Sequence, residues 1–80
     1  MAYYLDTIEQ IHGEEEGTYV EYGKREKKED YNTALTAFYT KLMNVSNSQS
    51  HVFLDIRIVN SEGGCLKKDS IGQYVGEEQS

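Results

Sequence analysis

The chain has 80 residues, enough for a single small domain with a thin core, and we expect one domain over residues 1–80. Hydrophobic residues make up 38% and charged residues 28%, a balance typical of folded proteins rather than disordered segments. The net charge of −6 argues against direct nucleic-acid binding, because such proteins neutralise phosphates with clustered Lys and Arg side chains.

The first segment, residues 2–12, allows two interpretations. Apolar side chains recur every third residue from Leu5, as on one face of a helix, whereas the tyrosines and threonine beside them favour a strand. We favour a strand because a glycine-flanked turn at 13–17 and a second alternating segment at 18–23 follow at once. The two segments together predict an antiparallel hairpin.

Residues 24–30 are densely charged, and we expect them to form a connector. A helix is predicted over about residues 29–45, because five apolar side chains recur at alternating spacings of four and three residues. These are Tyr31, Leu35, Phe38, Leu42 and Val45. Asp30 is the expected N-cap, since its carboxylate can accept hydrogen bonds from free amides of the first helical turn.

The clearest strand runs over residues 51–59, where apolar side chains occupy every second position. The side chains expected to pack on the helix are Val52, Leu54, Ile56 and Ile58. A three-residue loop at 61–63, with Gly63 in the left-handed conformation, then leads to a fourth strand at 65–75. Gly72 is a weak point of that strand, and residues 76–80 are expected to form a frayed acidic tail.

The loop sets the register of this second hairpin, because Asn60 then faces Gly64. The apolar pairs that result are Val59 with Cys65, Ile58 with Leu66, and Phe53 with Ile71. Four side chains form a crossed charge cluster on the face away from the helix: Arg57, Lys67, Asp55 and Asp69. The same face is expected to carry Phe53, Val59, Cys65 and Ile71.

These elements predict an α+β fold in the order ββαββ, with a four-stranded, mainly antiparallel sheet and one helix packed on one face. The sequence leaves the order of the strands within the sheet open. The expected core is Leu5, Ile8, Val20, Tyr31, Leu35, Phe38, Leu42, Val45, Val52, Leu54, Ile56, Ile58 and Leu66.

No residue is assigned to catalysis, to a cofactor or to a metal ion. Cys65 and His51 are the only thiol–imidazole pair to consider, and the predicted hairpin separates them by roughly 20 Å. The spacings that bind zinc or calcium are absent from the sequence. Gly63 and Gly64 join two strands, so they lack the helix N-terminus of a phosphate-binding loop.

The reducing cytosol is the expected compartment. Cys65 is the single cysteine, and a secreted domain of this size would usually need disulfides. The first six residues lack the basic and apolar regions of a signal peptide, and no segment approaches the roughly 20 apolar residues of a membrane span.

Seven tyrosines in 80 residues are too many for so small a core. Two interpretations stay open: aromatic pairing across the strands, or an exposed contact surface on the first hairpin. We select Tyr3, Tyr19, Phe53 and Ile71 as interaction residues. Because one helix covers only one face of the sheet, we expect a homodimer that pairs through the outer faces or edge to edge, with Phe53 or Ile71 near its centre.

A resemblance rests on residues that span most of the chain. They are Tyr3, Tyr4 and Leu5 with Ile8, Ala34 and Leu35 with Tyr39, and Ile58–Asn60 leading into Gly63 and Gly64. In these residues the chain resembles short uncharacterised proteins encoded by phages and prophages of Gram-positive, often gut, bacteria. The resemblance implies a bacterial cytosol or infected host cell and a small accessory protein, and it supplies no catalytic residue.

We therefore expect a non-enzymatic interaction protein, specifically a phage-encoded modulator or inhibitor of a host protein. Besides a second copy of itself, its expected partner is a host or phage protein. Such a protein could present carboxylates to a basic, nucleic-acid-binding site of its partner. The alternative is a small-molecule-binding protein with a pocket at a homo-oligomer interface, because 80 residues can hardly enclose a pocket alone. An enzyme is the third and least favoured hypothesis.

Overall fold

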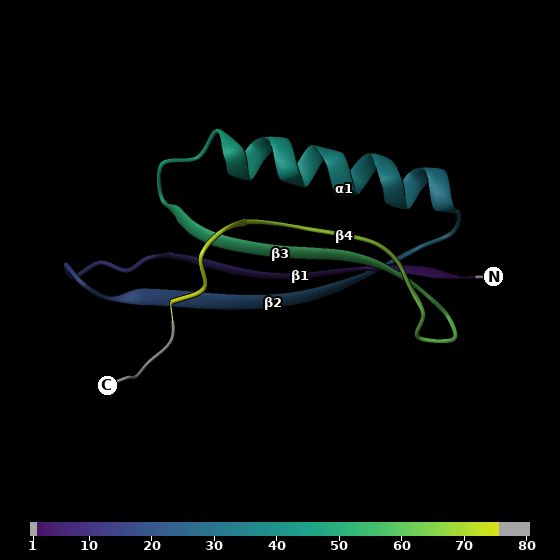
Figure 1. Cartoon of the computed structure of the whole chain (residues 1–80), viewed down its shortest axis with the longest axis horizontal. Helices are drawn as coiled ribbons and strands as arrows, with labels where there is room; N and C mark the ends of the chain where they lie inside the picture. Colours follow the sequence, from purple (N-terminus) through teal and green to yellow (C-terminus); the bar gives the residue numbers. More distant parts are fainter. Residues whose placement is uncertain (1, 76–80) are drawn as a thin grey trace.

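The computed structural model describes residues 2–75, which form one four-stranded antiparallel sheet with a single helix on one face (Figure 1). The elements are β1 (Tyr3–His12), β2 (Tyr19–Lys28), α1 (Tyr31–Ser46), β3 (His51–Asn60) and β4 (Cys65–Gly72). Their order in the sheet is β2-β1-β3-β4. The predicted α+β fold with ββαββ order is confirmed, and the acidic tail expected at 76–80 lies outside the described residues.

The first hairpin is longer than the sequence indicated. β1 and β2 pair without interruption from Tyr3 opposite Lys28 to His12 opposite Tyr19. The prediction of a charged connector from residue 24 is therefore wrong for residues 24–28. These charges fit a strand because β2 is an edge of the sheet, where alternate side chains remain in water on both faces.

The helix begins where the sequence predicted. The Asp30 side chain accepts a hydrogen bond from the Thr33 amide at 2.7 Å, so Asp30 is the N-cap. The helix packs mainly on β3 and β1, and its apolar stripe meets the strand residues that share its side of the sheet. The buried cluster consists of Leu5, Ala34, Phe38, Val45, Leu54, Ile56 and Ile58. The predicted helix residues Tyr31, Leu35 and Leu42 pack at its rim and are only partly buried.

Three residues expected in the core are exposed: Ile8 by 43%, Val20 by 39% and Leu66 by 46%. Ile8 lies three residues after Leu5, and a spacing of three places two residues on opposite faces of a strand. Val20 lies on the edge strand β2, beyond the cover of the helix. Leu66 lies at an irregularity of β4 and faces no residue of β3.

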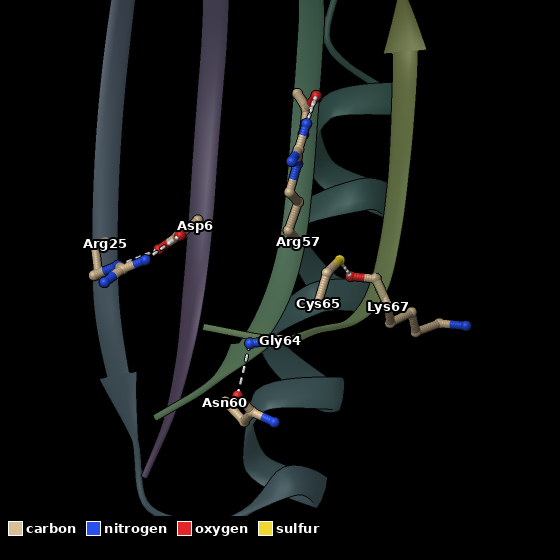
Figure 2. Close-up of polar contacts among 8 residues, drawn as sticks. Asp6, Arg25, Arg57, Asn60, Gly64, Cys65 and Lys67 are labelled. Carbon is tan, nitrogen blue, oxygen red and sulfur yellow. Dashed lines mark hydrogen bonds and ion pairs between the residues drawn. The ribbon is translucent and has the colours of Figure 1, made fainter. Parts of the chain in front are cut away.

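The second hairpin keeps its predicted loop but not its predicted register. Gly63 has the expected positive φ of 90°, and the Asn60 side chain accepts a hydrogen bond from the Gly64 amide at 2.8 Å (Figure 2). Val59 faces Cys65 as predicted, and the register then shifts by one residue. Ile71 consequently faces Leu54 rather than Phe53, so it packs against the core on the helix side and not on the outer face.

The same shift removes the crossed charge cluster that the sequence predicted. Arg57 faces Lys68 instead of Lys67, and Asp55 faces Ser70 instead of Asp69. Arg57 then bonds along its own strand, with its Nε 3.0 Å from an Asp55 carboxylate oxygen.

The chain turns after β4 and returns across the outer face of the sheet, which we define as the face away from α1. Gly72 has φ 76° and lies so close to the Val52 carbonyl that a Cβ would collide with it. The strand ends at this residue, three residues before the predicted limit. The Val75 amide donates to the Gln10 side-chain oxygen at 2.7 Å, and Tyr74 stacks edge to face on Phe53. Figure 1 shows this segment crossing from β4 toward β2.

Candidate functional site: a groove between the helix and the edge strand

A hollow lies between α1 and the half of the sheet formed by β1 and β2. It measures about 520 Å³, and we call it the α1–β2 groove. It forms because α1 lies over β3 and β1, which leaves the β2 side of the sheet uncovered. Figure 1 shows the helix running along one face of the sheet above the strands.

The floor of the groove contains a buried hydroxyl. Leu5 and Thr7 project from β1 on the helix side, and Thr7 is only 6% exposed. Among residues 2–75, no side chain or backbone group makes a hydrogen bond to the Thr7 hydroxyl. The hydroxyl borders a groove of about 520 Å³, so within the protein it stays available to a hydrogen-bonding group that enters the groove.

The helix supplies a wall that carries further hydroxyls. Thr33, Thr36 and Thr40 lie three and four residues apart, which places them on one side of α1, facing the groove. Ala37 lies between them and adds an apolar surface. This wall therefore offers methyl groups for contact and hydroxyls for hydrogen bonding, with little bulk to close the groove.

The strand β2 supplies a charged wall. Every second residue from Lys24 to Lys28 is charged, so the side chains of Lys24, Glu26 and Lys28 all point to the helix side. Glu26 bridges the two ammonium groups, at 2.8 Å from Lys24 and 3.4 Å from Lys28. Its hydrogen bond with Lys24, aided by Lys28, lowers the pKa of Glu26. The wall therefore keeps one excess positive charge in a protein whose net charge is −6.

A polar network around Glu9 adjoins the groove where Lys41 lines it. The Glu9 carboxylate lies 2.7 Å from Lys41 Nζ and 2.7 Å from His51 Nε2, and His51 Nδ1 lies 2.8 Å from the Ser48 hydroxyl. Burial raises the pKa of Glu9, but the hydrogen bonds from Lys41 and His51 outweigh burial and leave that pKa lowered. The network ties β1, α1 and the start of β3 together and positions Lys41 beside the groove.

The outer face of the sheet carries ion pairs instead of a second layer. Arg25 binds the Asp6 carboxylate with two hydrogen bonds of 2.6 Å (Figure 2). Its guanidinium also lies over the Tyr4 ring. Figure 2 views these side chains with α1 behind the sheet. Ile8 is exposed on the same face. This face is therefore a mixed apolar and charged surface.

The four residues selected from the sequence do not form one site. Tyr3 packs edge to face on Tyr31, on the helix side of the sheet. Tyr19 is exposed beside His12, at the opposite end of the first hairpin. Phe53 lies on the outer face under Tyr74, and Ile71 lies on the helix side.

The thiol and the imidazole considered for catalysis lie near opposite ends of β3. Cys65 is exposed, and its Sγ contacts the Lys67 carbonyl oxygen at 3.6 Å (Figure 2). His51 begins β3, next to Glu9 and Ser48, whereas Cys65 faces Val59 near the other end of that strand. Within residues 2–75, no three His, Cys, Asp or Glu side chains gather where they could hold a metal ion.

The residues of the groove were missed because none belongs to a known motif. Two signals in the sequence point to them. The threonines of the helix recur at helical spacing on the side away from the apolar stripe, and the charges of residues 24–28 alternate in sign on one side of a strand. Neither signal says that the helix leaves β2 uncovered, and that placement creates the groove.

Comparison of the chain with known protein families, with curated proteins and with solved structures found no match. No helix within residues 2–75 has the length and apolar content that a membrane crossing requires.

Proposed function

We propose that the protein is a small, non-enzymatic binding protein and that the α1–β2 groove is its ligand site. The observation that supports this most directly is Thr7, a buried threonine that lines the groove and whose hydroxyl has no hydrogen-bond partner among residues 2–75. A ligand atom that bonds to Thr7 would give this hydroxyl a partner at a position largely shielded from bulk water, and that hydrogen bond would contribute to binding affinity. His51 is engaged by Glu9 and Ser48, which favours a structural rather than a catalytic role for the imidazole.

The lining of the groove indicates the chemistry of the ligand. Leu5, Ala37 and the threonine methyl groups suit a small apolar body. Lys24 and Lys28 suit an anionic end, a carboxylate or a phosphate, at the β2 wall. A volume of about 520 Å³ matches a small organic molecule, and a single copy of the chain supplies these residues.

The experiment is a titration followed by ¹H–¹⁵N correlation spectra, with a set of aryl carboxylates and aryl phosphates as probes. We expect the amide shifts to concentrate on Thr7, Thr33 and Lys28. The neutral alcohol of each probe serves as the matched control and should bind more weakly. Shifts that spread evenly over the surface, or that favour the outer face, would contradict this site.

A second candidate function is the binding of a host protein through the outer face, as a phage-encoded modulator in the bacterial cytosol. The exposed Ile8 beside the Asp6–Arg25 ion pair supports it, because a mixed apolar and charged surface is typical of transient interfaces. The test is capture of a partner from a bacterial lysate by wild type, by Ile8→Asp and by Tyr22→Asp, which alters the helix side. Only Ile8→Asp should lose the partner, and equal capture by all three proteins would exclude this face.

A further inference from the structure

Within residues 2–75, β2 is an edge strand whose second side pairs with no other strand. Its ten residues pair with β1 on one side only, without an irregularity, and nearly all of them are exposed. The opposite edge, β4, has eight residues, a register shift near Leu66 and a turn at Gly72. Irregular, short edges resist pairing with another chain, whereas long regular edges invite it.

The hydrogen-bond pattern of the first hairpin shows which residues of β2 face outward. The Gly13 amide donates to the Thr18 carbonyl at 2.8 Å, and bonding toward β1 then recurs at every second residue. The amides and carbonyls at the free edge are therefore those of the odd-numbered residues: Tyr19, Glu21, Gly23, Arg25 and Lys27. An antiparallel copy of β2 must place odd-numbered residues opposite odd-numbered residues.

Charge selects one register among those that this pattern allows. With Gly23 opposite Gly23, each Glu21 faces the Arg25 of the other copy, each Tyr22 faces a Lys24, and no like charges are opposed. Moving the second copy by two residues in one direction places Lys24 opposite Lys24. Moving it by two residues in the other direction places Glu21 opposite Gly23, so both ion pairs are lost.

We propose that two copies of the chain join through the free edges of β2, antiparallel and with Gly23 opposite Gly23, to form an eight-stranded sheet. Arg25, which already binds Asp6 within its own copy, then lies between Asp6 and the Glu21 of the second copy. This pairing requires no ligand in the groove, so its failure and the failure of the proposed ligand site are distinguishable.

The pairing would also complete the groove. A two-fold axis perpendicular to the sheet leaves both copies of α1 on the same side, so the two grooves face each other across the paired β2 strands. The helix of each copy lies over β3 and β1, and four strand spacings therefore separate the two helix axes, roughly 19 Å. Lys24 and Lys28 of both copies would line the floor of this shared trough.

Charge reversal with complementation tests the register. Glu21→Arg alone places an arginine opposite Arg25 at both of the equivalent contacts. Arg25→Glu alone places a glutamate opposite Glu21 at both of them. Each should raise the dissociation constant of the dimer by about tenfold in sedimentation equilibrium. An equimolar mixture of the two variants restores both opposite-charge pairs and should dimerise as the wild type does.

Cross-linking gives a second measurement that does not depend on these charges. Gly23→Cys in a Cys65→Ser background should be joined in high yield by a short bismaleimide, because the two thiols lie next to the axis and a Cβ at Gly23 meets no atom within 4 Å. Glu62→Cys, in the exposed β3–β4 loop, is the matched control and should remain uncoupled. A wild type that stays monomeric at several hundred micromolar, or equal coupling of the two variants, would overturn the proposal.

Discussion

At the scale of single residues, the Thr7 hydroxyl has a consequence for stability. Thr7→Val keeps the shape and replaces a hydroxyl without a partner in residues 2–75 by a methyl group, so we expect the free energy of unfolding to stay the same or to rise by up to about 1 kcal/mol. Urea denaturation measures it. Thr40→Val, at an exposed hydroxyl of the helix wall, is the matched control and should change little. A loss of stability in Thr7→Val would mean that the hydroxyl has an internal partner.

Glu9 links the stability of the protein to pH. Lys41 and His51 hold its pKa below the ordinary value, so folded Glu9 keeps its charge to lower pH than Glu9 in the unfolded chain. Its contribution is present above about pH 4.5 and is lost as the pH falls through the lowered pKa. Glu9→Gln should therefore flatten the fall in unfolding free energy between pH 5 and pH 3. Glu14→Gln, in the exposed turn, should leave that fall unchanged.

At the scale of the elements, a comparison of two glycines distinguishes the energetic cost of backbone strain from that of a steric collision. Gly63 and Gly72 both have positive φ, but only a Cβ at Gly72 would collide with the Val52 carbonyl. Gly63→Ala should cost about 1 kcal/mol of unfolding free energy, whereas Gly72→Ala should cost about 2–4 kcal/mol. Thermal unfolding compares them, and equal costs would mean that the chain does not turn tightly at Gly72.

The elements that the sequence predicted well are those with a simple apolar period. The alternation of Val52, Leu54, Ile56 and Ile58 and the helical stripe ending at Val45 each indicate one structure. β2 was cut short because solvated charges hide the alternation of Lys24, Glu26 and Lys28 on a strand edge. The register of β4 was missed because the irregularity near Leu66 leaves no sign in local composition. The groove depends on where α1 sits above the sheet, which no single segment encodes.

At the scale of the whole molecule, the edge and the outer face make different predictions for the homodimer. Phe53 lies on the outer face beneath Tyr74, away from the free edge of β2. Phe53→Lys should therefore leave the dimer dissociation constant within about twofold of the wild-type value. Sedimentation equilibrium of both proteins at matched concentrations measures it. Loss of the dimer in this variant, with the far-UV circular dichroism unchanged, would place the interface on the outer face instead.

The most direct test of the groove as the ligand site is the dissociation constant of the tightest aryl carboxylate or aryl phosphate, measured by calorimetry on wild type and Thr7→Val together. The variant lacks the hydroxyl to which the ligand would bond, so we expect binding to weaken about fivefold in a protein that is at least as stable as the wild type. Equal affinity in the two proteins would contradict a ligand site built around Thr7.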